Sequence, residues 1–135
     1  MTEYVLIAEG SYGKVLATTN AMNDIVDVCK GNPSLRKAIQ KKCELFAEEG
    51  QTAFNHKTLR SEGKRQVGGK LAKKIQVWAI SHTGKQYRLY GGIDTTEGVF
   101  VAGSCDKKQQ DAADQAMLDR AAEAFHEYME DKKGK

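Results

Sequence analysis

The sequence predicts an α+β fold, in which helices and strands occupy separate stretches of the chain. Two amphipathic helical patterns precede residue 50, three short apolar stretches separated by turn residues follow between residues 75 and 102, and another long helical pattern comes after them. With 135 residues, the chain is large enough for a single hydrophobic core. We therefore expect one domain over residues 1–131 and a disordered basic tail over 132–135.

An N-terminal strand pair is the first expected element. Residues 4–7 and 14–19 are rich in β-branched and apolar residues, and the glycines between them favour a turn. Residues 10–15 resemble the glycine-rich loop of protein kinases, but Ala8 stands at the first glycine position and no kinase catalytic motif follows. We therefore expect a hairpin turn here.

Two helices are expected next. Thr19 or Asn20 caps the first, whose apolar residues recur at helical spacing until Gly31. The second begins at Asn32-Pro33-Ser34 and keeps an apolar stripe until Gly50. The short connection predicts an antiparallel helical hairpin.

Residues 56–74 form a basic segment, with seven bases against the single acid Glu62. Gly63, Gly68 and Gly69 interrupt it, so we expect a mobile loop. Clustered Lys and Arg side chains favour a nucleic-acid backbone, because binding releases its counterions. The alternative is a solvated loop without a ligand. The bases are Lys57, Arg60, Lys64, Arg65, Lys70, Lys73 and Lys74.

A three-stranded antiparallel meander is expected over residues 75–81, 86–93 and 99–102, followed by a helix over 107–128. Trp78, Tyr87 and Tyr90 on adjacent strands are candidates for stacking on bases, although aromatic side chains on sheets usually belong to the core. Further basic candidates for RNA binding are Lys85, before the second strand, and Lys108, at the helix start.

The candidate catalytic residues are Arg88, Lys107, His82 and His56. Cleavage of RNA without a metal needs a base for the 2′-OH, an acid for the 5′-oxygen and cations for the phosphorane charge. A cation within a strand needs either a carboxylate partner or a bound phosphate, which is why Arg88 stands out. We expect no metal and no cofactor, because the acids around the meander form no recognisable carboxylate cluster.

The succession of elements from about Asp24 to Tyr128 resembles the RelE/ParE toxin superfamily, especially its HigB-like and phage-borne branch. The most specific pieces are the strand Tyr87-Arg88-Leu89-Tyr90 and the helix start Lys107-Lys108-Gln109. The resemblance implies a RelE-like domain and a cytoplasmic toxin that cleaves messenger RNA on the ribosome and is neutralised by an antitoxin. In the ParE branch the implied target is instead DNA gyrase.

Two features keep other interpretations open. Gln76, Trp78, Ala112 and Ala113 stand where RelE-type nucleases carry catalytic residues, which leaves a catalytically silent adaptor acting by protein contact. The three strands and last helix are also similar to the C-terminal part of a double-stranded RNA-binding domain.

Three widely spaced cysteines fit reduced thiols in a cytoplasmic protein, and no apolar run predicts a membrane span.

Overall fold

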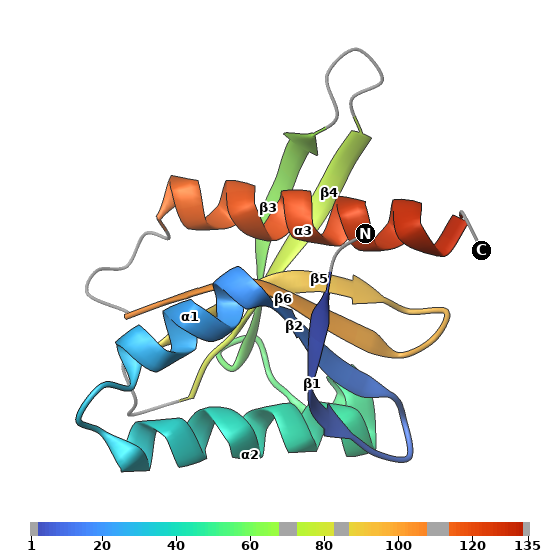
Figure 1. Cartoon of the computed structure of the whole chain (residues 1–135). Coiled ribbons are helices and arrows are strands. Elements are labelled where there is room, and N and C mark those ends of the chain that lie inside the picture. The colour runs from blue at the N-terminus through green and yellow to red at the C-terminus, as the bar shows by residue number, and fades with distance from the viewer. Residues whose placement is uncertain (1–2, 68–72, 83–86, 108–113, 134–135) are drawn as a thin grey trace.

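The computed structural model shows a mixed six-stranded sheet with α-helices packed on it (Figure 1). It describes residues 3–67, 73–82, 87–107 and 114–133, and only the backbone of Lys73. In chain order the strands are β1 (Tyr4–Glu9), β2 (Lys14–Thr18), β3 (Leu59–Val67), β4 (Lys73–Ile80), β5 (Arg88–Asp94) and β6 (Val99–Asp106). Their order in the sheet is β1-β2-β6-β5-β4-β3, so β1 and β3 are the two edges. This confirms the α+β class. None of the helices in these ranges is long and apolar enough to cross a bilayer.

The N-terminal hairpin is confirmed. Strand β1 (Tyr4–Glu9) pairs antiparallel with β2 (Lys14–Thr18). Strand β2 in turn pairs parallel with β6, which joins the hairpin to the rest of the sheet. Glycine is required in the turn because a Cβ atom on Gly13 would lie 1.8 Å from the carbonyl oxygen of Gly98.

Both N-terminal helices are confirmed, but the expected cap of the first, Thr19 or Asn20, is wrong: both residues lie within the helix, and the cap is Thr18. Helix α1 (Thr19–Val28) begins after Thr18, whose hydroxyl accepts a 3.1 Å hydrogen bond from the Ala21 amide. Helix α2 (Pro33–Glu49) begins after Asn32 and ends at Gly50, which has a φ of +70°. The expected helical hairpin needs a correction: α1 packs mainly along β6, whereas α2 packs on β1 and β2.

The basic segment is not the mobile loop that its composition predicts. Most of it forms the edge strand β3 (Leu59–Val67), which pairs antiparallel with β4 (Lys73–Ile80). Leu59 and Val67 are buried, and the register shifts around Gly63, which has a φ of +89°. Charged side chains are common on edge strands, where they discourage pairing with other chains. The basic composition therefore reflects an edge strand.

The antiparallel meander is confirmed by the pairing of β4 with β5 (Arg88–Asp94) and of β5 with β6 (Val99–Asp106). Strand β6 continues to Asp106, beyond the expected end at residue 102. Its last part lies beside α1, where the Cys105 amide donates a 3.1 Å hydrogen bond to the Asp24 carboxylate. This bond supports the end of β6 beyond its pairing with β2.

The last helix begins and ends later than expected. Helix α3 (Gln115–Lys133) is capped by Asp114, whose carboxylate accepts a 2.9 Å hydrogen bond from the Ala116 amide. Lys107 is therefore not at a helix start, and residues 108–113 lie outside the described ranges. Lys132 and Lys133 form the last helical turn, so the disordered tail is wrong for them. Residues 134–135 also lie outside the described part of the chain.

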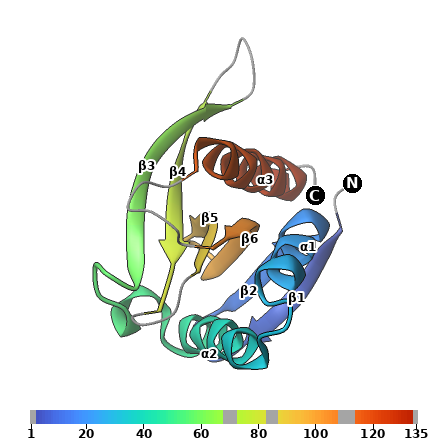
Figure 2. The same cartoon turned by 90° about the vertical axis from the view of Figure 1, so that its left-hand side faces the viewer.

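The hydrophobic core lies on both faces of the sheet. On one face α1, α2 and the sheet enclose the largest cluster, which includes Phe46, Leu89 and Phe100. On the other face α3 covers two smaller clusters, built around Val77 and Tyr128. Figure 2 shows α3 on one side of β5 and β6, with α2 on the other.

A buried carboxylate fastens the end of α3 to the turn between β5 and β6. Asp94 is 3% exposed and accepts hydrogen bonds from the Lys132 ammonium, the Tyr128 hydroxyl and the Thr96 amide. Burial raises the pKa of Asp94, but the hydrogen bond and charge of Lys132 outweigh it, so the pKa lies below its ordinary value. The ionised form is therefore favoured by folding.

We expect Asp94→Asn to lower the free energy of unfolding at pH 7 by about 1–3 kcal/mol, because buried donors lose their anionic acceptor. A carboxyl with a lowered folded-state pKa contributes stability above its unfolded pKa and loses it as pH falls through the folded value. The difference between wild type and variant should therefore shrink below about pH 4. Urea unfolding from pH 7 to pH 2 measures it, with Glu49→Gln, an exposed carboxylate at the end of α2, as control. A difference that stays constant over this range would contradict the role given to the charge.

Candidate nucleic-acid interface

Four strands share one end of the sheet, and the candidate catalytic residues lie there. The register pairs Leu59 with Ile80, Ile80 with Leu89, and Leu89 with Cys105, so these residues form one row across β3, β4, β5 and β6. The residues just before or beyond this row make up what we call the sheet end. It includes His56, His82, Arg88 and Lys107. Figure 2 looks onto this side of the molecule.

The two histidines flank a hydrogen-bonded junction between the start of β3 and the end of β4. The Ser81 amide donates to the Thr58 carbonyl, and the Ser81 hydroxyl donates to the Lys57 carbonyl, each at 2.8 Å. His56 is exposed and His82 is half-buried. An imidazole can both accept and donate a proton, so both side chains are chemically suited to acid–base work.

Arg88 is built into the sheet. It is the first residue of β5, lies opposite Asp106 on β6 and is only 3% exposed. It also hydrogen-bonds the Tyr90 hydroxyl: burial raises the pKa of Tyr90, while the hydrogen bond and charge of Arg88 lower it. The register therefore supplies a carboxylate opposite this cation. Lys107, one residue beyond Asp106, is exposed.

Tyr87 and Tyr90 are core residues, which argues against base stacking. Both side chains are at most 1% exposed, and reaching a base would require the sheet to open. The Tyr87 hydroxyl has no hydrogen-bond partner within the described part of the chain. It lies within electrostatic range of three unpaired, buried thiols, and burial raises the pKa of each: Cys29, Cys43 and Cys105.

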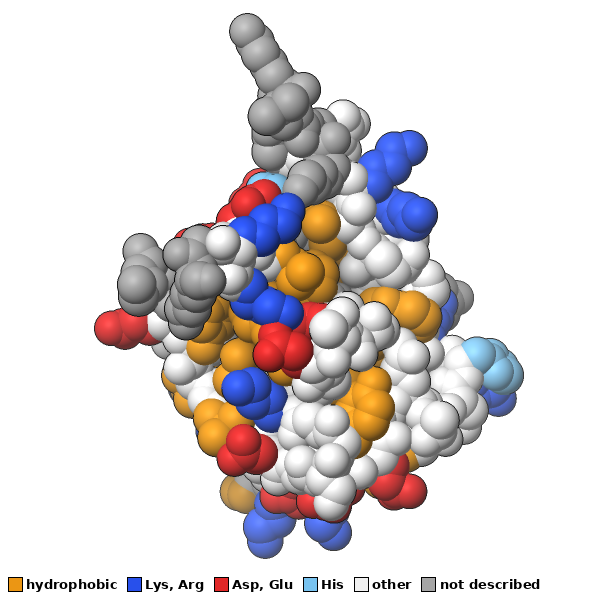
Figure 3. Space-filling model, turned by 90° about the vertical axis from the view of Figure 1, so that its right-hand side faces the viewer, with side chains coloured by type: hydrophobic (Ala, Val, Ile, Leu, Met, Phe, Trp, Pro, Cys, Tyr) orange, Lys and Arg blue, Asp and Glu red, His pale blue; other side chains and the backbone are white. Residues whose placement is uncertain are grey.

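The side of the β3–β4 ribbon that faces away from α3 is polar and basic; we call it the outer face. Arg65, Val67, Ile75 and Val77 point toward α3, so their neighbours in the strands point away from it. The register pairs Lys64 with Gln76, and Gln66 with Lys74. Blue side chains project from the right-hand edge of Figure 3, the side on which β3 and β4 lie. The outer-face residues are Ser61, Lys64, Gln66, Lys74, Gln76 and Trp78.

Direct contacts order the outer face, and among the described helices none has substantial packing on β3 and β4 apart from α3. The Gln76 amide donates to the Ser61 hydroxyl at 2.7 Å and to the Gly63 carbonyl at 3.1 Å. Lys64 and Lys74 are exposed, and Trp78 is half-buried beside them. This surface offers two lysines, two glutamines and part of an indole ring to a ligand.

The structure separates the other bases of the segment. Arg60 and Arg65 lie on the opposite face from Lys64, and Arg65 is held by α3 through a 2.7 Å ion pair with Asp119 and a hydrogen bond to Gln115. Lys57 is exposed at the sheet end. The predicted RNA-binding residues Lys70, Lys85 and Lys108 lie outside the described ranges, as does the side chain of Lys73.

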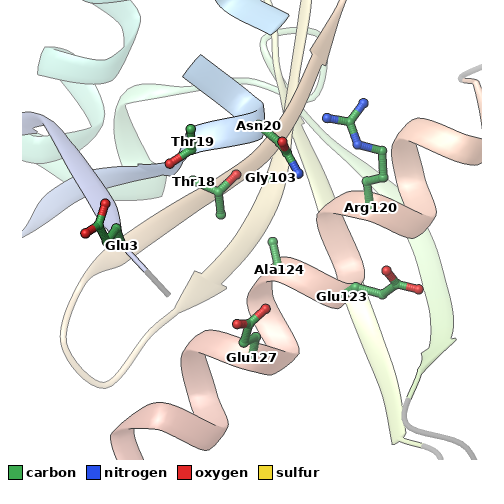
Figure 4. A pocket seen from close by; sticks show the side chains of 9 residues that line it. All are labelled: Glu3, Thr18, Thr19, Asn20, Gly103, Arg120, Glu123, Ala124 and Glu127. Atoms are coloured by element: carbon green, nitrogen blue, oxygen red, sulfur yellow. The ribbon is translucent and has the colours of Figure 1, made fainter. Parts of the chain in front are cut away.

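A pocket of about 240 Å³ opens elsewhere, between the start of α1, Gly103 on β6 and α3 (Figure 4). Three carboxylates line it, from Glu3, Glu123 and Glu127, together with Arg120. Arg120 is already paired with Asp24 at 3.1 Å. The pocket is therefore unsuited to phosphate, and sequence reasoning did not find it because its residues are scattered along the chain.

Among the described residues, no group of three or more His, Cys, Asp or Glu side chains is placed to hold a metal ion. Comparison of the chain with family models, curated proteins and solved structures gives no match. Function must therefore be argued from the sheet end and the outer face.

We expect Tyr87→Phe to raise the free energy of unfolding by about 1 kcal/mol, because the wild-type hydroxyl is buried without a partner among the described residues. RNA affinity should stay unchanged, since Tyr87 is enclosed in the core. Urea unfolding and a filter-binding assay measure the two quantities. Tyr12→Phe, at an exposed position, serves as control. Weaker RNA binding by Tyr87→Phe at undiminished stability would contradict the assignment to the core.

Proposed function

We propose that the protein binds RNA on the outer face and cleaves it at the sheet end, and that it acts as a cytoplasmic toxin held in check by an antitoxin or another protein partner. The observation that supports cleavage best is the row Leu59–Ile80–Leu89–Cys105, because it brings candidate groups from distant parts of the chain to one end of the sheet. The toxin role, with messenger RNA on the ribosome as substrate, rests on the resemblance to the RelE/ParE superfamily.

The proposed reaction is an attack of the RNA 2′-oxygen on the adjacent phosphorus. One histidine, His56 or His82, takes the 2′-OH proton while the 2′-O–P bond forms. The P–O5′ bond then breaks, and the other histidine, in its protonated form, gives its proton to the departing 5′-oxygen. The products are a 2′,3′-cyclic phosphate and a 5′-hydroxyl. Lys107 is the exposed cation suited to the phosphorane charge.

The outer face supplies affinity in this proposal. Lys64 and Lys74 lie toward one end of the β3–β4 ribbon, and the sheet end lies at its opposite end. A strand of RNA can therefore follow the ribbon from these lysines to the sheet end. The exposed Gln66 amide can hydrogen-bond sugar and phosphate oxygens, and the exposed part of Trp78 can contact a base. Such a surface binds without reading sequence, because its contacts are mainly with the backbone.

We expect the double variant Lys64→Gln/Lys74→Gln to bind single-stranded RNA more weakly and with a shallower salt dependence. Loss of two phosphate contacts should reduce the slope of log K against log salt by about 1.4. Fluorescence anisotropy with a labelled oligonucleotide measures both. The matched control is Lys37→Gln/Lys41→Gln, which removes the same charge from the exposed surface of α2. An equal loss of RNA affinity in the two double variants would contradict a specific role for the outer face, because it would show that only the net charge of the protein matters.

We expect His56→Gln, His82→Gln and Lys107→Gln each to lower RNA cleavage by about 10²–10⁴-fold, the range usual for a lost acid, base or charge contact. Purified protein, end-labelled RNA and detection of the cyclic phosphate measure the reaction. Inducible expression of wild type beside each variant then reports growth and messenger RNA integrity. Lys37→Gln, on the exposed surface of α2, is the control for nonspecific loss. Growth arrest without cleavage would disprove the nuclease proposal and leave a protein target such as gyrase.

Binding without cleavage is the second candidate function, and the burial of Arg88 favours it. A cation that lies opposite Asp106 and hydrogen-bonds Tyr90 already has protein partners, so a phosphate has to compete with them. In that case the protein is an RNA-binding module or an adaptor. Tight RNA binding with no cyclic-phosphate product, in wild type and variants alike, would select this function.

A further inference from the structure

The two edges of the sheet differ sharply in the side chains that they expose. Edge strand β3 carries charged and amide side chains along both faces. Edge strand β1 instead exposes two large aliphatic side chains, Val5 at 43% and Leu6 at 52%. Edge strands normally carry charges, prolines or bulges that discourage pairing with another chain. Exposed aliphatic residues on an open edge indicate a surface that a partner covers.

An apolar groove of about 170 Å³ adjoins β1 and extends this surface. It lies between β1, α1 and α2 and is lined mainly by aliphatic side chains, among them Val5, Met22 and Ile39, with Arg36 as the single charged residue of its lining. Gln40 stands at the groove and donates a 2.8 Å hydrogen bond to the Ile7 carbonyl, which fixes the strand against α2. The open edge thus has a place beside it for apolar side chains of an added strand.

The charges at the two ends of β1 identify the kind of occupant. At the start of the strand Glu3 shares the pocket of Figure 4 with Glu123 and Glu127. At its end Glu9 is exposed and lies near the turn where Ser11 hydrogen-bonds Glu48, with Lys14 of β2 opposite Glu9. An apolar centre between acidic ends is complementary to an apolar strand with basic ends.

Two other occupants fit less well. RNA is repelled by the carboxylates at both ends of β1. In a second copy of this chain, antiparallel pairing about Leu6 would set Glu3 of each copy opposite Glu9 of the other, and like charges directly opposite destabilise a strand pair.

We propose that β1 is a docking edge for an extended segment of a partner protein, which adds a strand to the sheet and has an apolar centre flanked by Lys or Arg. Main-chain hydrogen bonds to β1 supply affinity, and the groove and terminal glutamates supply selectivity. This interface lies at the opposite edge of the sheet from β3, and it does not depend on RNA binding.

The test uses two fluorescent peptides with the same alternating valine–threonine centre, one with lysine pairs and one with glutamate pairs at its ends. We expect the full chain to bind the lysine peptide at least about tenfold more tightly, because charge complementarity selects the partner. Leu6→Thr should weaken binding of the lysine peptide, and the double variant Glu3→Gln/Glu9→Gln should abolish most of the preference between the two peptides. Hydrogen exchange should show new protection in β1 on peptide binding, with none in β3.

The matched control is Val26→Thr, which changes an aliphatic side chain exposed at 55% on α1, away from the groove. It should leave peptide binding unchanged, and Leu6→Thr should leave RNA binding unchanged. The proposal is overturned if neither peptide binds, if both bind equally, or if Leu6→Thr and Val26→Thr lose affinity alike. A wild-type dimer in sedimentation that Leu6→Thr dissociates would also overturn it, in favour of a second copy.

Discussion

The close approach of α3 to β5 and β6 is the constraint on which the rest of the structure depends. A Cβ atom on Gly92 would lie 2.2 Å from the Phe125 ring, and one on Gly103 would lie 2.7 Å from the Ala121 Cα. Any side chain at these positions would push the helix off the sheet. Because α3 lies so close, its polar side chains reach elements on three sides: Asp119 reaches β3, Arg120 reaches α1, and Lys132 reaches the β5–β6 turn. The two glycines therefore allow α3 to lie close to the sheet. The ion pairs of α3 in turn hold the β3–β4 ribbon, α1 and the β5–β6 turn in place.

Much of this fold could be predicted from the sequence, because most elements carry their own signals. Helix α2 has a cap, an N-terminal proline and an apolar stripe, and the strands of the meander are short apolar stretches between turns. Strand β3 could not be predicted in the same way. Its burial depends on Leu59 and Val67 at its two ends, and the charges between them are those of an edge strand. An edge strand is defined by the neighbour that it lacks, which local sequence does not record.

In the candidate site, too, composition predicts the region, and only the strand register shows which residues share a face. The basic bias of residues 56–74 correctly marks a cationic region, but it does not say which bases share a face. Lys64 and Arg65 are adjacent in sequence and lie on opposite faces, one exposed and the other paired with Asp119. Arg88 was prominent in the sequence as a cation within a strand, and only the pairing with β6 reveals the carboxylate opposite it. The edge strand β1 was predicted as a strand, but its exposed apolar side chains became visible only with the sheet order.

The sheet order also separates the surfaces by charge. The outer face presents lysines, while the two ends of β1 carry Glu3 and Glu9, and four strands lie between these edges. A polyanion is therefore attracted to one edge of the sheet and repelled from the other, although the net charge is only +3. A basic, extended protein segment experiences the opposite preference. A partner bound at β1 would thus leave the outer face open unless it were long enough to cross the sheet. Such a partner could inhibit RNA binding only through a segment that continues beyond the docking edge and reaches the outer face. Whether the partner and RNA compete is therefore decided by the length of the partner and not by its affinity for β1.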